Sequence, residues 1–322
     1  MNTATLDSLG RRLRTTPQTT GKRVRLTDRD CQWLRALLAH GPLPSSYLLA
    51  FSAKLGQSEK RARERLTDLF NEADTAHGGP YLSRPLQQFR TLDSRYNQLV
   101  YDLAPPGRRA LETGDLPFEA PAPGGPWVHR LMVSCITASI ELAVSIRDDL
   151  TFIPGWRILE RAGATLRTTV ETKEPGVDHA VRRALIPDAL FGLQYRTPAG
   201  DRFRFFVVEA DRGTEPLKSR CAARKSWRRS LAQYDEYIGR RRYRDHLQLT
   251  APLLVLNVAS DADRERAMHQ STQMFHQHGC TYHLFQSFEA FGAVWRPPQP
   301  NPALLEAPWL RTGHPDMHIG DA

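Results

Sequence analysis

The stretch that decides the fold is residues 183–213, RALIPDALFGLQYRTPAGDRFRFFVVEADRG. Two apolar runs, residues 186–195 and 203–208, flank the segment 197–200. That segment carries Pro and Gly at positions that a tight turn favours, so the pattern predicts a β-hairpin. The middle of each run is apolar at consecutive positions, which is typical of an interior strand covered on both faces.

A hairpin folded symmetrically about the peptide bond between Pro198 and Ala199 places Asp188 directly opposite Glu209. Opposed side chains in an antiparallel pair lie roughly 5 Å apart at Cβ, and like charges at that distance repel. A divalent cation would neutralise them, and Mg²⁺ (or Mn²⁺) favours one or two carboxylates together with phosphate oxygens. Asp211 follows Glu209 by two residues and faces the same side. The spacing therefore predicts a metal site of Asp188, Glu209 and Asp211.

A simpler interpretation also fits the same residues. Asp188 and Glu209 could mark the strand ends and reach solvent without any ligand. The register is inferred, and a slip of one residue would move the two side chains to opposite faces of the sheet.

The composition favours a polyanionic partner. The 322 residues include 44 Lys and Arg against 35 Asp and Glu, a formal net charge of +9. No amphipathic basic tail with Trp or Phe anchors is evident, so nucleic acid is favoured over a membrane. There is no run of 18 apolar residues and no signal-peptide pattern. The four cysteines lack metal or disulfide spacing, which indicates a cytoplasmic protein.

The first part of the chain predicts a flexible arm and three helices. Residues 1–26 are polar and basic, as expected of a flexible arm. A capping-box pattern follows, with Thr27 as N-cap and Asp30 three residues later. Further helical patterns start near residues 44 and 58. The third helix carries four cations on its outer faces: Lys60, Arg61, Arg63 and Arg65.

Two strands of a wing are expected after the third helix. Residues 81–82 and 99–103 have strand character, and the long tip between them carries Arg84, Arg90 and Arg95. Three helices, the last of them basic, followed by two strands are typical of a winged helix-turn-helix domain that binds DNA. Residues 27–111 are therefore expected to form such a domain, with these seven cations on the DNA. A small helical domain that docks another protein is the alternative.

Residues 112–126 are rich in Pro and Gly and predict a linker to a second domain. The second domain, residues 127–295, is expected to be α/β, with a mixed sheet flanked by helices. It begins with a nearly all-apolar helix, residues 129–149, whose lone internal acid, Glu141, needs either an Arg or the metal site as its partner. Residues 163–181 have no clear period and are expected to form a loop. Residues 296–322 carry several prolines and are expected to form a loosely packed tail.

Helix and strand patterns alternate after the hairpin. Residues 224–244 predict one helix with an apolar stripe of Trp227, Leu231, Tyr234 and Ile238. Residues 253–258 predict a buried strand that pairs in parallel with the hairpin after this helical crossover. A helix at 261–277 and a short strand at 282–285 complete the domain.

This order of elements, with acids at one end of the hairpin, resembles the PD-(D/E)XK nuclease fold. The likeness is carried by Pro187 and Asp188, by Glu209, and by Gln233 and Tyr237, which match the QxxxY helix motif of some members. More closely, residues 27–245 resemble the replication-relaxation family of plasmid and mobile-element proteins. The matching segments are the winged-helix start, IPDALFGL and FFVVEADRGTEP.

The resemblance implies a DNA-binding protein of plasmid replication or DNA relaxation that nicks or cleaves DNA with Mg²⁺ or Mn²⁺. Asp188 and Glu209 would hold the metal, and Glu141 would be the acid of the first core helix. Gln233 and Tyr237 would orient the site or the DNA backbone.

One residue departs from the nuclease pattern. A Lys is expected two residues after Glu209, where this chain has Asp211. A carboxylate binds metal but cannot supply positive charge to the phosphate. Lys225 could supply it, as could Lys218 or Arg212.

The departure leaves a second interpretation open. Catalysis could be lost, leaving a replication or transcription regulator that only binds DNA. The oligomeric state also stays open, with a homodimer as one option.

Overall fold

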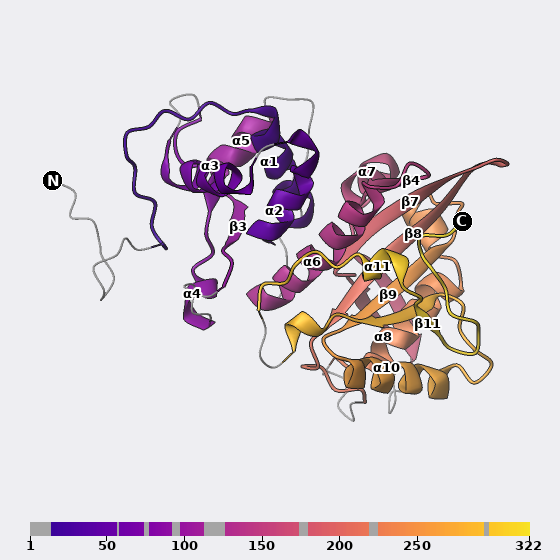
Figure 1. The fold of residues 1–322 in the computed structure, drawn as a ribbon. Helices are drawn as coiled ribbons and strands as arrows, with labels where there is room; N and C mark the ends of the chain where they lie inside the picture. The colour runs from indigo at the N-terminus through magenta and orange to yellow at the C-terminus, as the bar shows by residue number, and fades with distance from the viewer. Residues whose placement is uncertain are drawn as a thin grey trace. The chain divides into compact units, whose positions relative to one another are not determined.

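The chain is mixed α/β and divides into two compact units (Figure 1). The first comprises Met1–Ala138 with Arg296–Pro300, and the second comprises Ser139–Trp295 with Asn301–Ala322. The division falls inside α6 (Trp127–Val144), whereas the expected linker at 112–126 lies almost wholly outside the described residues. The computed structural model describes residues 14–56, 58–73, 77–91, 97–112, 126–173, 180–218, 225–292 and 296–322.

The helices of the N-terminal unit begin where their sequence signals place them. α1 (Asp28–His40) has the predicted capping box, in which the Thr27 side chain accepts from the Asp30 amide and the Asp30 carboxylate accepts from the Thr27 amide. α2 (Ser45–Phe51) and α3 (Glu59–Asn71) follow. The predicted inward face of α3 is confirmed by its buried residues, Ala62, Leu66, Leu69 and Phe70.

A small antiparallel sheet joins these helices. β2 (Leu82–Ser83) pairs with β3 (Val100–Leu103), as expected for the two strands after the third helix. β1 (Leu43–Pro44) also pairs with β3, so the strand order is β1-β3-β2. Sequence reasoning missed β1 because two residues are too short to show a period. The short helices α4 (Gln87–Thr91) and α5 (Pro105–Glu112) complete the described part of this unit.

The described part of the expected arm lies against α3. The side chain of Glu72, at the end of α3, is only 2% exposed. Its carboxylate accepts hydrogen bonds from Thr19 Oγ1 at 2.6 Å and from Thr20 N at 2.9 Å and Oγ1 at 2.7 Å. A buried carboxylate needs such donors, and the arm supplies them. Residues 14–26 are therefore part of the folded unit, contrary to the expectation of a flexible arm.

The C-terminal unit is built on a six-stranded mixed sheet in the described part of the chain, with the order β11-β10-β9-β8-β7-β4. β8, β9 and β10 run parallel, and the other pairs are antiparallel. The expected parallel strand after the hairpin is therefore confirmed. The strands are β4 (Leu150–Pro154), β7 (Ala189–Thr197), β8 (Gly200–Asp211), β9 (Leu253–Ala259), β10 (His283–Ser287) and β11 (Leu310–Arg311).

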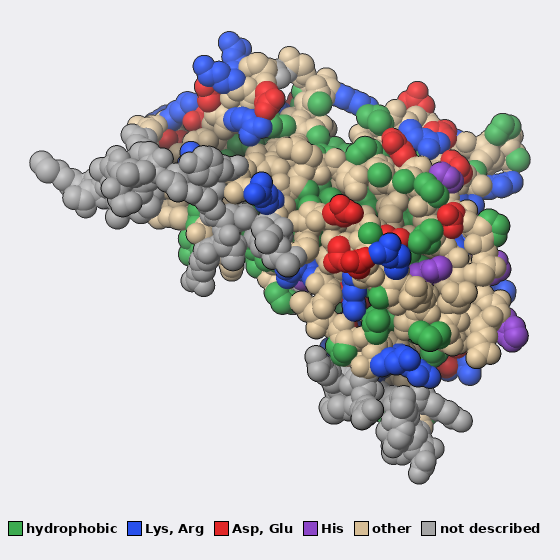
Figure 2. All heavy atoms as spheres, turned by 60° about the horizontal axis from the view of Figure 1, so that its bottom comes forward, with side chains coloured by type: hydrophobic (Ala, Val, Ile, Leu, Met, Phe, Trp, Pro, Cys, Tyr) green, Lys and Arg blue, Asp and Glu red, His purple; other side chains and the backbone are tan. Residues whose placement is uncertain are grey.

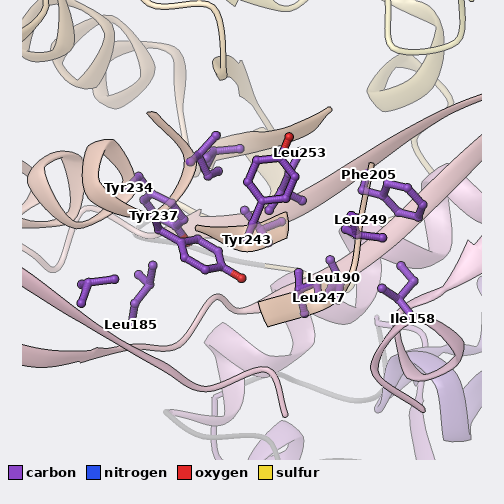
Figure 3. Close-up of a cluster of buried hydrophobic side chains, with 14 residues drawn as sticks. Ile158, Leu185, Leu190, Phe205, Tyr234, Tyr237, Tyr243, Leu247, Leu249 and Leu253 are labelled. Atoms are coloured by element: carbon purple, nitrogen blue, oxygen red, sulfur yellow. The ribbon is translucent and has the colours of Figure 1, made fainter. Parts of the chain in front are cut away.

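Alternate residues of the strands build a core on each face of the sheet. On one face, Val207 and Val255 pack with aromatic and aliphatic residues of the helical segment 227–247 (Figure 3). On the other, the Phe191 ring stacks on Phe152 and Phe206, with centroids 5.2 and 5.1 Å apart. Apolar side chains on both faces explain the unbroken apolar runs of the hairpin strands.

Two helices flank the sheet before the hairpin. The expected apolar helix is α6, which is long and apolar enough to cross a membrane by length and composition, but 67% of it is buried, as in a core helix. α7 (Gly155–Ala162) begins directly after β4. A Cβ on Gly155 would lie 2.1 Å from the Leu190 carbonyl oxygen, so only Gly lets α7 start this close to β7.

Residues 163–181 are not a simple loop. β5 (Thr168–Lys173) and β6 (Ala180–Leu185) form a separate two-stranded antiparallel sheet. Val170 and Leu185 are buried against the helical segment after the hairpin. The outer face of β6, which includes Arg182 and Ala184, is exposed. The sequence of β6 does not alternate clearly between polar and apolar residues, so it did not predict a strand.

The single helix expected at 224–244 is interrupted. α8 (Trp227–Tyr234) passes into a π-helical turn, η2 (Asp235–Gly239), and α9 (Tyr243–Leu247) follows after residues with positive φ such as Arg241. The helix expected at 261–277 is confirmed as α10 (Ala262–Phe275), capped by Asp261.

The C-terminal segment is an integral part of the sheet unit, contrary to the expected loose tail. β11 pairs with β10, and α11 (Ala303–Glu306) accepts a hydrogen bond from Gln286 at the Ala303 carbonyl. Trp309 is fully buried, and its indole donates to the Leu304 carbonyl at 3.1 Å. The prolines of this segment limit its helices and strands but do not prevent burial.

Replacing Trp309 should destabilise the C-terminal unit. Trp309→Ala removes a fully buried indole and one buried hydrogen bond, so we expect a loss of about 3–5 kcal/mol in the free energy of unfolding. Trp309→Phe keeps most of the apolar volume and should cost clearly less. Urea unfolding followed by circular dichroism measures both, and equal stability of Trp309→Ala and the parent protein would contradict the integral role of this segment.

Candidate active site

The register of β7 and β8 brings Asp188 and Glu209 together. The pairing runs from Thr197 opposite Gly200 to Ala189 opposite Val208, and one further residue in the same register would place Asp188 opposite Glu209. The Asp188 amide donates to the Val208 carbonyl at 3.0 Å, one residue out of this register, so the regular pairing ends at Ala189 and Asp188 lies just before β7. Its carboxylate still lies near Glu209, because it is one of the charges that act on the Glu209 pKa. The register predicted from the turn is therefore confirmed as far as Ala189.

The Asp188 carboxylate is held in place by the main chain. Its Oδ2 accepts a hydrogen bond from the Ala210 amide at 2.8 Å. This contact ties the carboxylate of one strand to the residue after Glu209 on the other strand.

The Glu209 carboxyl lies in an unusual electrostatic environment. Burial and the nearby Asp188 raise its pKa to about 8, although Lys225 and the Tyr234 hydroxyl act in the opposite direction. The Tyr234 hydroxyl donates directly to Glu209 Oε1. Removing water disfavours the charged carboxylate, and a like charge disfavours it further. Glu209 is therefore largely protonated at neutral pH when no cation is bound.

Tyr234 reaches this carboxyl, whereas the motif tyrosine Tyr237 does not. The Tyr237 hydroxyl pairs with His246 Nδ1 at 2.7 Å, and its ring lies in the apolar cluster of Figure 3. Gln233 donates to the Ala184 carbonyl of β6 at 3.1 Å. The π-helical turn begins directly after Tyr234, and such turns are frequent at functional sites.

Sequence reasoning placed Tyr234 on the inward apolar stripe and gave it no further role. A signal was available, because a buried Tyr hydroxyl usually needs a hydrogen-bond partner. Of the motif pair, Gln233 contacts β6 and Tyr237 contacts His246 near the end of α9, so both hold neighbouring elements in place and neither reaches Glu209.

Lys225 belongs to the same electrostatic cluster. Its Nζ lies 3.2 Å from Glu215 Oε1. Burial lowers the pKa of Lys225, but the charges of Glu209, Glu215 and Asp188 outweigh that effect and raise it. This lysine is thus a fixed positive charge close to the opposed carboxyls. Lys218 is exposed, and Arg212 follows Asp211 with a pKa lowered by burial.

Asp211 does not join the pair, although it lies on the same face of β8. Arg264 at the start of α10 donates two hydrogen bonds to the Asp211 carboxylate, from Nε to Oδ1 at 3.0 Å and from NH2 to Oδ2 at 2.8 Å. Glu141 is half-buried on α6, and it is not among the strongest influences on Glu209. Across the described residues, no group of three or more His, Cys, Asp or Glu is arranged to hold a metal ion.

Two uncharged polar side chains, Asn257 and His283, lie beside the site on the neighbouring strands β9 and β10. Asn257 of β9 is the register neighbour of Glu209. Its amide Nδ2 contacts His283 Nδ1 at 3.1 Å and the Leu284 carbonyl at 2.9 Å, and its Oδ1 has no hydrogen-bond partner in the described structure. Burial lowers the pKa of His283 to about 3, so this ring is neutral at physiological pH. Sequence reasoning missed both residues, because a single polar residue in an apolar run gives no motif.

The predicted DNA-binding cations fall into two groups. Lys60, Arg61 and Arg63 on α3 are exposed, and Arg63 pairs with Glu59 at 2.7 Å. Arg65 instead forms an ion pair at 2.6 Å with Asp30, which is fully buried. On the face shown in Figure 2, basic and acidic side chains are interspersed over both units.

The remaining three predicted cations belong to the expected wing. Arg84 is only 8% exposed and stacks over the Phe70 ring at 3.9 Å. Arg90 lies on α4, but its side chain is outside the described structure, and Arg95 lies outside the described residues. Arg65 and Arg84 are therefore structural in this fold and do not face outward.

The comparison with family models places the chain in a known class. The Replication-relaxation family model matches residues 34–252, which is more than half of the chain. The protein belongs to the Replication-relaxation family, and this membership indicates a function related to replication. No curated protein and no solved structure matches the chain significantly.

The raised pKa of Glu209 should make the metal-free protein less stable as pH rises. The folded-state pKa of about 8 exceeds the ordinary model value of 4.5, so the folded protein binds more protons between these values. The contribution is fully present below about pH 4.5 and is lost as pH rises through about 8. Thermal unfolding between about pH 4 and about pH 9, values that bracket the window, should show a falling midpoint.

The matched variants isolate this effect. Glu209→Gln cannot ionise and should flatten the fall, and Asp188→Asn should flatten it in part by removing the repelling charge. Glu160→Gln, an exposed change on α7, is the control and should follow the parent protein. An unchanged pH slope in Glu209→Gln would show that another group causes the fall.

Proposed function

We propose that this protein cleaves or nicks DNA by metal-dependent phosphodiester hydrolysis, at the site formed by Asp188, Glu209 and Lys225. The observation that carries the proposal is the opposed carboxyl pair. Burial raises the pKa of Glu209, and the nearby Asp188 carboxylate raises it further. Strongly perturbed carboxyls of this kind are typical of functional sites.

The residues fit a magnesium or manganese ion. Mg²⁺ commonly uses one or two protein carboxylates and completes its shell with water and phosphate oxygens. Asp188 and Glu209 supply these carboxylates, and a dication would replace the proton on Glu209. When bound, the ion would lower the pKa of a water and offset charge on the scissile phosphate.

The chain's own groups would orient and stabilise this chemistry. The Ala210 amide fixes the Asp188 carboxylate, and the Tyr234 hydroxyl fixes the Glu209 carboxyl. Lys225 would provide positive charge to the phosphate, in place of the lysine that PD-(D/E)XK nucleases carry where this chain has Asp211. Preorganised charge of this type is often the largest single contribution to rate enhancement.

The N-terminal unit would hold the DNA. Its order of helix, strand, two helices and two strands, with the first strand joining the later pair, is typical of winged-helix domains. Lys60, Arg61 and Arg63 form the exposed cationic part of α3. These side chains would neutralise DNA phosphates, which makes binding dependent on salt.

A regulator without catalytic activity is the second candidate. The observation that favours it is the ion pair between Asp211 and Arg264, which removes the third carboxylate of the predicted metal set. Such a protein would bind DNA through the same α3 cations and would cleave nothing. The two candidates differ only in cleavage, so one assay separates them.

Cleavage should depend on the three site residues. Purified protein with Mg²⁺ or Mn²⁺ should nick supercoiled plasmid, and Asp188→Ala and Glu209→Gln should each abolish nicking. Lys225→Ala should slow it by about 100-fold or more while leaving DNA affinity nearly unchanged, because one electrostatic stabiliser is lost. Gel-based nicking assays and fluorescence anisotropy provide the two measurements.

The control is Lys54→Ala, a change of an exposed lysine in the N-terminal unit. It should cleave at the parent rate. Absence of cleavage on supercoiled, linear and single-stranded DNA with either metal would remove the nuclease proposal and favour the regulator.

DNA binding should weaken when the exposed cations of α3 change sign. Replacing Lys60, Arg61 and Arg63 with Glu should lower affinity strongly and reduce the dependence of log Kd on log salt, because fewer counterions are released. The control Arg35→Glu changes an exposed cation on α1. An unchanged salt slope in the triple variant would place the DNA contact elsewhere.

A further inference from the structure

The N-terminal unit contains a cavity that neither cleavage nor duplex binding explains. It has a volume of about 450 Å³ and is lined by the folded arm, one face of α3 and the β3 region. Three of its lining side chains are cationic: Arg14, Arg63 and Arg84. The described lining residues include no Asp or Glu, so no carboxylate of the described lining offsets these cations.

Arg84 is the buried cation of this cavity. Its guanidinium lies between the rings of Phe70 and Tyr101, 3.9 and 5.1 Å from their centroids. It donates to the Arg14 carbonyl and the Tyr101 hydroxyl, both at 3.1 Å, and its Nε has no partner within the described structure. Burial lowers its pKa, and the charge of Arg14 lowers it further.

An unpaired buried guanidinium is costly, and proteins usually offset it with an anion. Three acids of α3 and its C-cap have partners of their own: Glu59 pairs with Arg63, Asp68 with Lys22, and the Glu72 carboxylate accepts from the arm. Among the described residues, the charges that act on the pKa of Arg84 belong to Tyr101 and Arg14, and neither is a carboxylate. The missing counter-charge is therefore expected to come from a ligand.

The other groups of the cavity suit a polar organic anion. Gln18 and Asn71 line it, and the Gln18 amide Nε2 is buried without a hydrogen-bond partner in the described structure. The Tyr101 ring and Leu66 supply apolar surface. A volume of this size lies in the range of small-molecule sites, about 300–1,000 Å³.

We propose that this cavity binds a phosphate-bearing ligand of about the size of a nucleotide, with its phosphate against Arg14 and Arg84. Guanidinium groups match phosphate oxygens in geometry and stay charged, which makes them common phosphate ligands. Two sources carry this chemistry: a free nucleotide, or the phosphorylated end of a DNA strand. The proposal does not depend on cleavage at Asp188 and Glu209.

Calorimetric titration of the full chain tests the proposal. The probes are ATP and inorganic pyrophosphate, with adenosine as the matched ligand that lacks phosphate, at about 0.15 M salt to limit nonspecific attraction to a basic protein. A second pair of probes is a short single-stranded oligonucleotide with and without a 5′-phosphate. We expect phosphorylated probes to bind and to raise the thermal midpoint, since a ligand of the folded state stabilises it.

The variants locate the site. Arg84→Gln and Arg14→Ala should each weaken binding by about tenfold or more, in line with loss of a charge-assisted hydrogen bond. Arg14 and Gln18 lie on the arm, so Arg14→Ala and Gln18→Ala keep the test valid if Arg84→Gln fails to fold. Arg35→Ala removes an exposed cation of α1 that does not line the cavity, and it should bind like the parent protein.

Each outcome decides the proposal. Binding of ATP or pyrophosphate that the arm variants weaken supports a free nucleotide, and a preference for the 5′-phosphorylated strand alone supports a DNA end. Absence of binding by every phosphorylated probe at millimolar concentration overturns the proposal. Binding that is equal in the parent protein, Arg84→Gln and Arg14→Ala overturns it too, because the anion would then lie elsewhere.

Discussion

The pairing of β7 with β8 is the constraint on which the C-terminal unit depends. The tight turn at residues 198–199 fixes the register, and side chains alternate strictly along each strand, so the turn alone determines which residues meet. β8 then pairs in parallel with β9, and β4 pairs with β7, so both hairpin strands are interior. Their unbroken apolar runs follow from this position. The same register sets Asp188 beside Glu209 where β7 begins and β8 nears its end.

The site shows how a fold holds like charges together. Separate contacts fix the two carboxyls: the Ala210 amide holds Asp188, and the Tyr234 hydroxyl holds Glu209. Burial of the sheet then raises the Glu209 pKa, because no water is available to stabilise a second negative charge. Lys225 lies close enough to offset part of this charge. Arg264 neutralises the third acid, Asp211, so the site carries less negative charge than the sequence suggests.

The N-terminal unit uses its cations in different ways. Lys60 and Arg61 stay exposed on α3, whereas Arg65 pairs with the buried Asp30 and Arg84 is buried between two aromatic rings at the wall of the cavity. A count of basic residues on a helix therefore overstates the surface available to DNA. The folded arm adds a further constraint, since Thr19 and Thr20 satisfy the buried Glu72 and bring residues 14–26 against α3. This packing also forms a wall of the cationic cavity.

The sequence by itself determined the features that depend on neighbours along the chain. These include the capping box at Thr27, the inward face of α3, the hairpin register, and the parallel strand after the crossover, because turn chemistry and periodicity are local. Tertiary structure alone decided which side chains meet across elements. Tyr234, the last residue of α8, reaches Glu209, whereas Tyr237 lies within the π-helical turn that follows and contacts His246. Asp211 pairs with Arg264 because α10 begins beside it. Residues 301–322 carry no periodic signal, yet they are packed against the unit. β11 pairs with the edge of β10, and the Trp309 side chain is fully buried. Such partners lie far apart in sequence, so no local pattern could have predicted them.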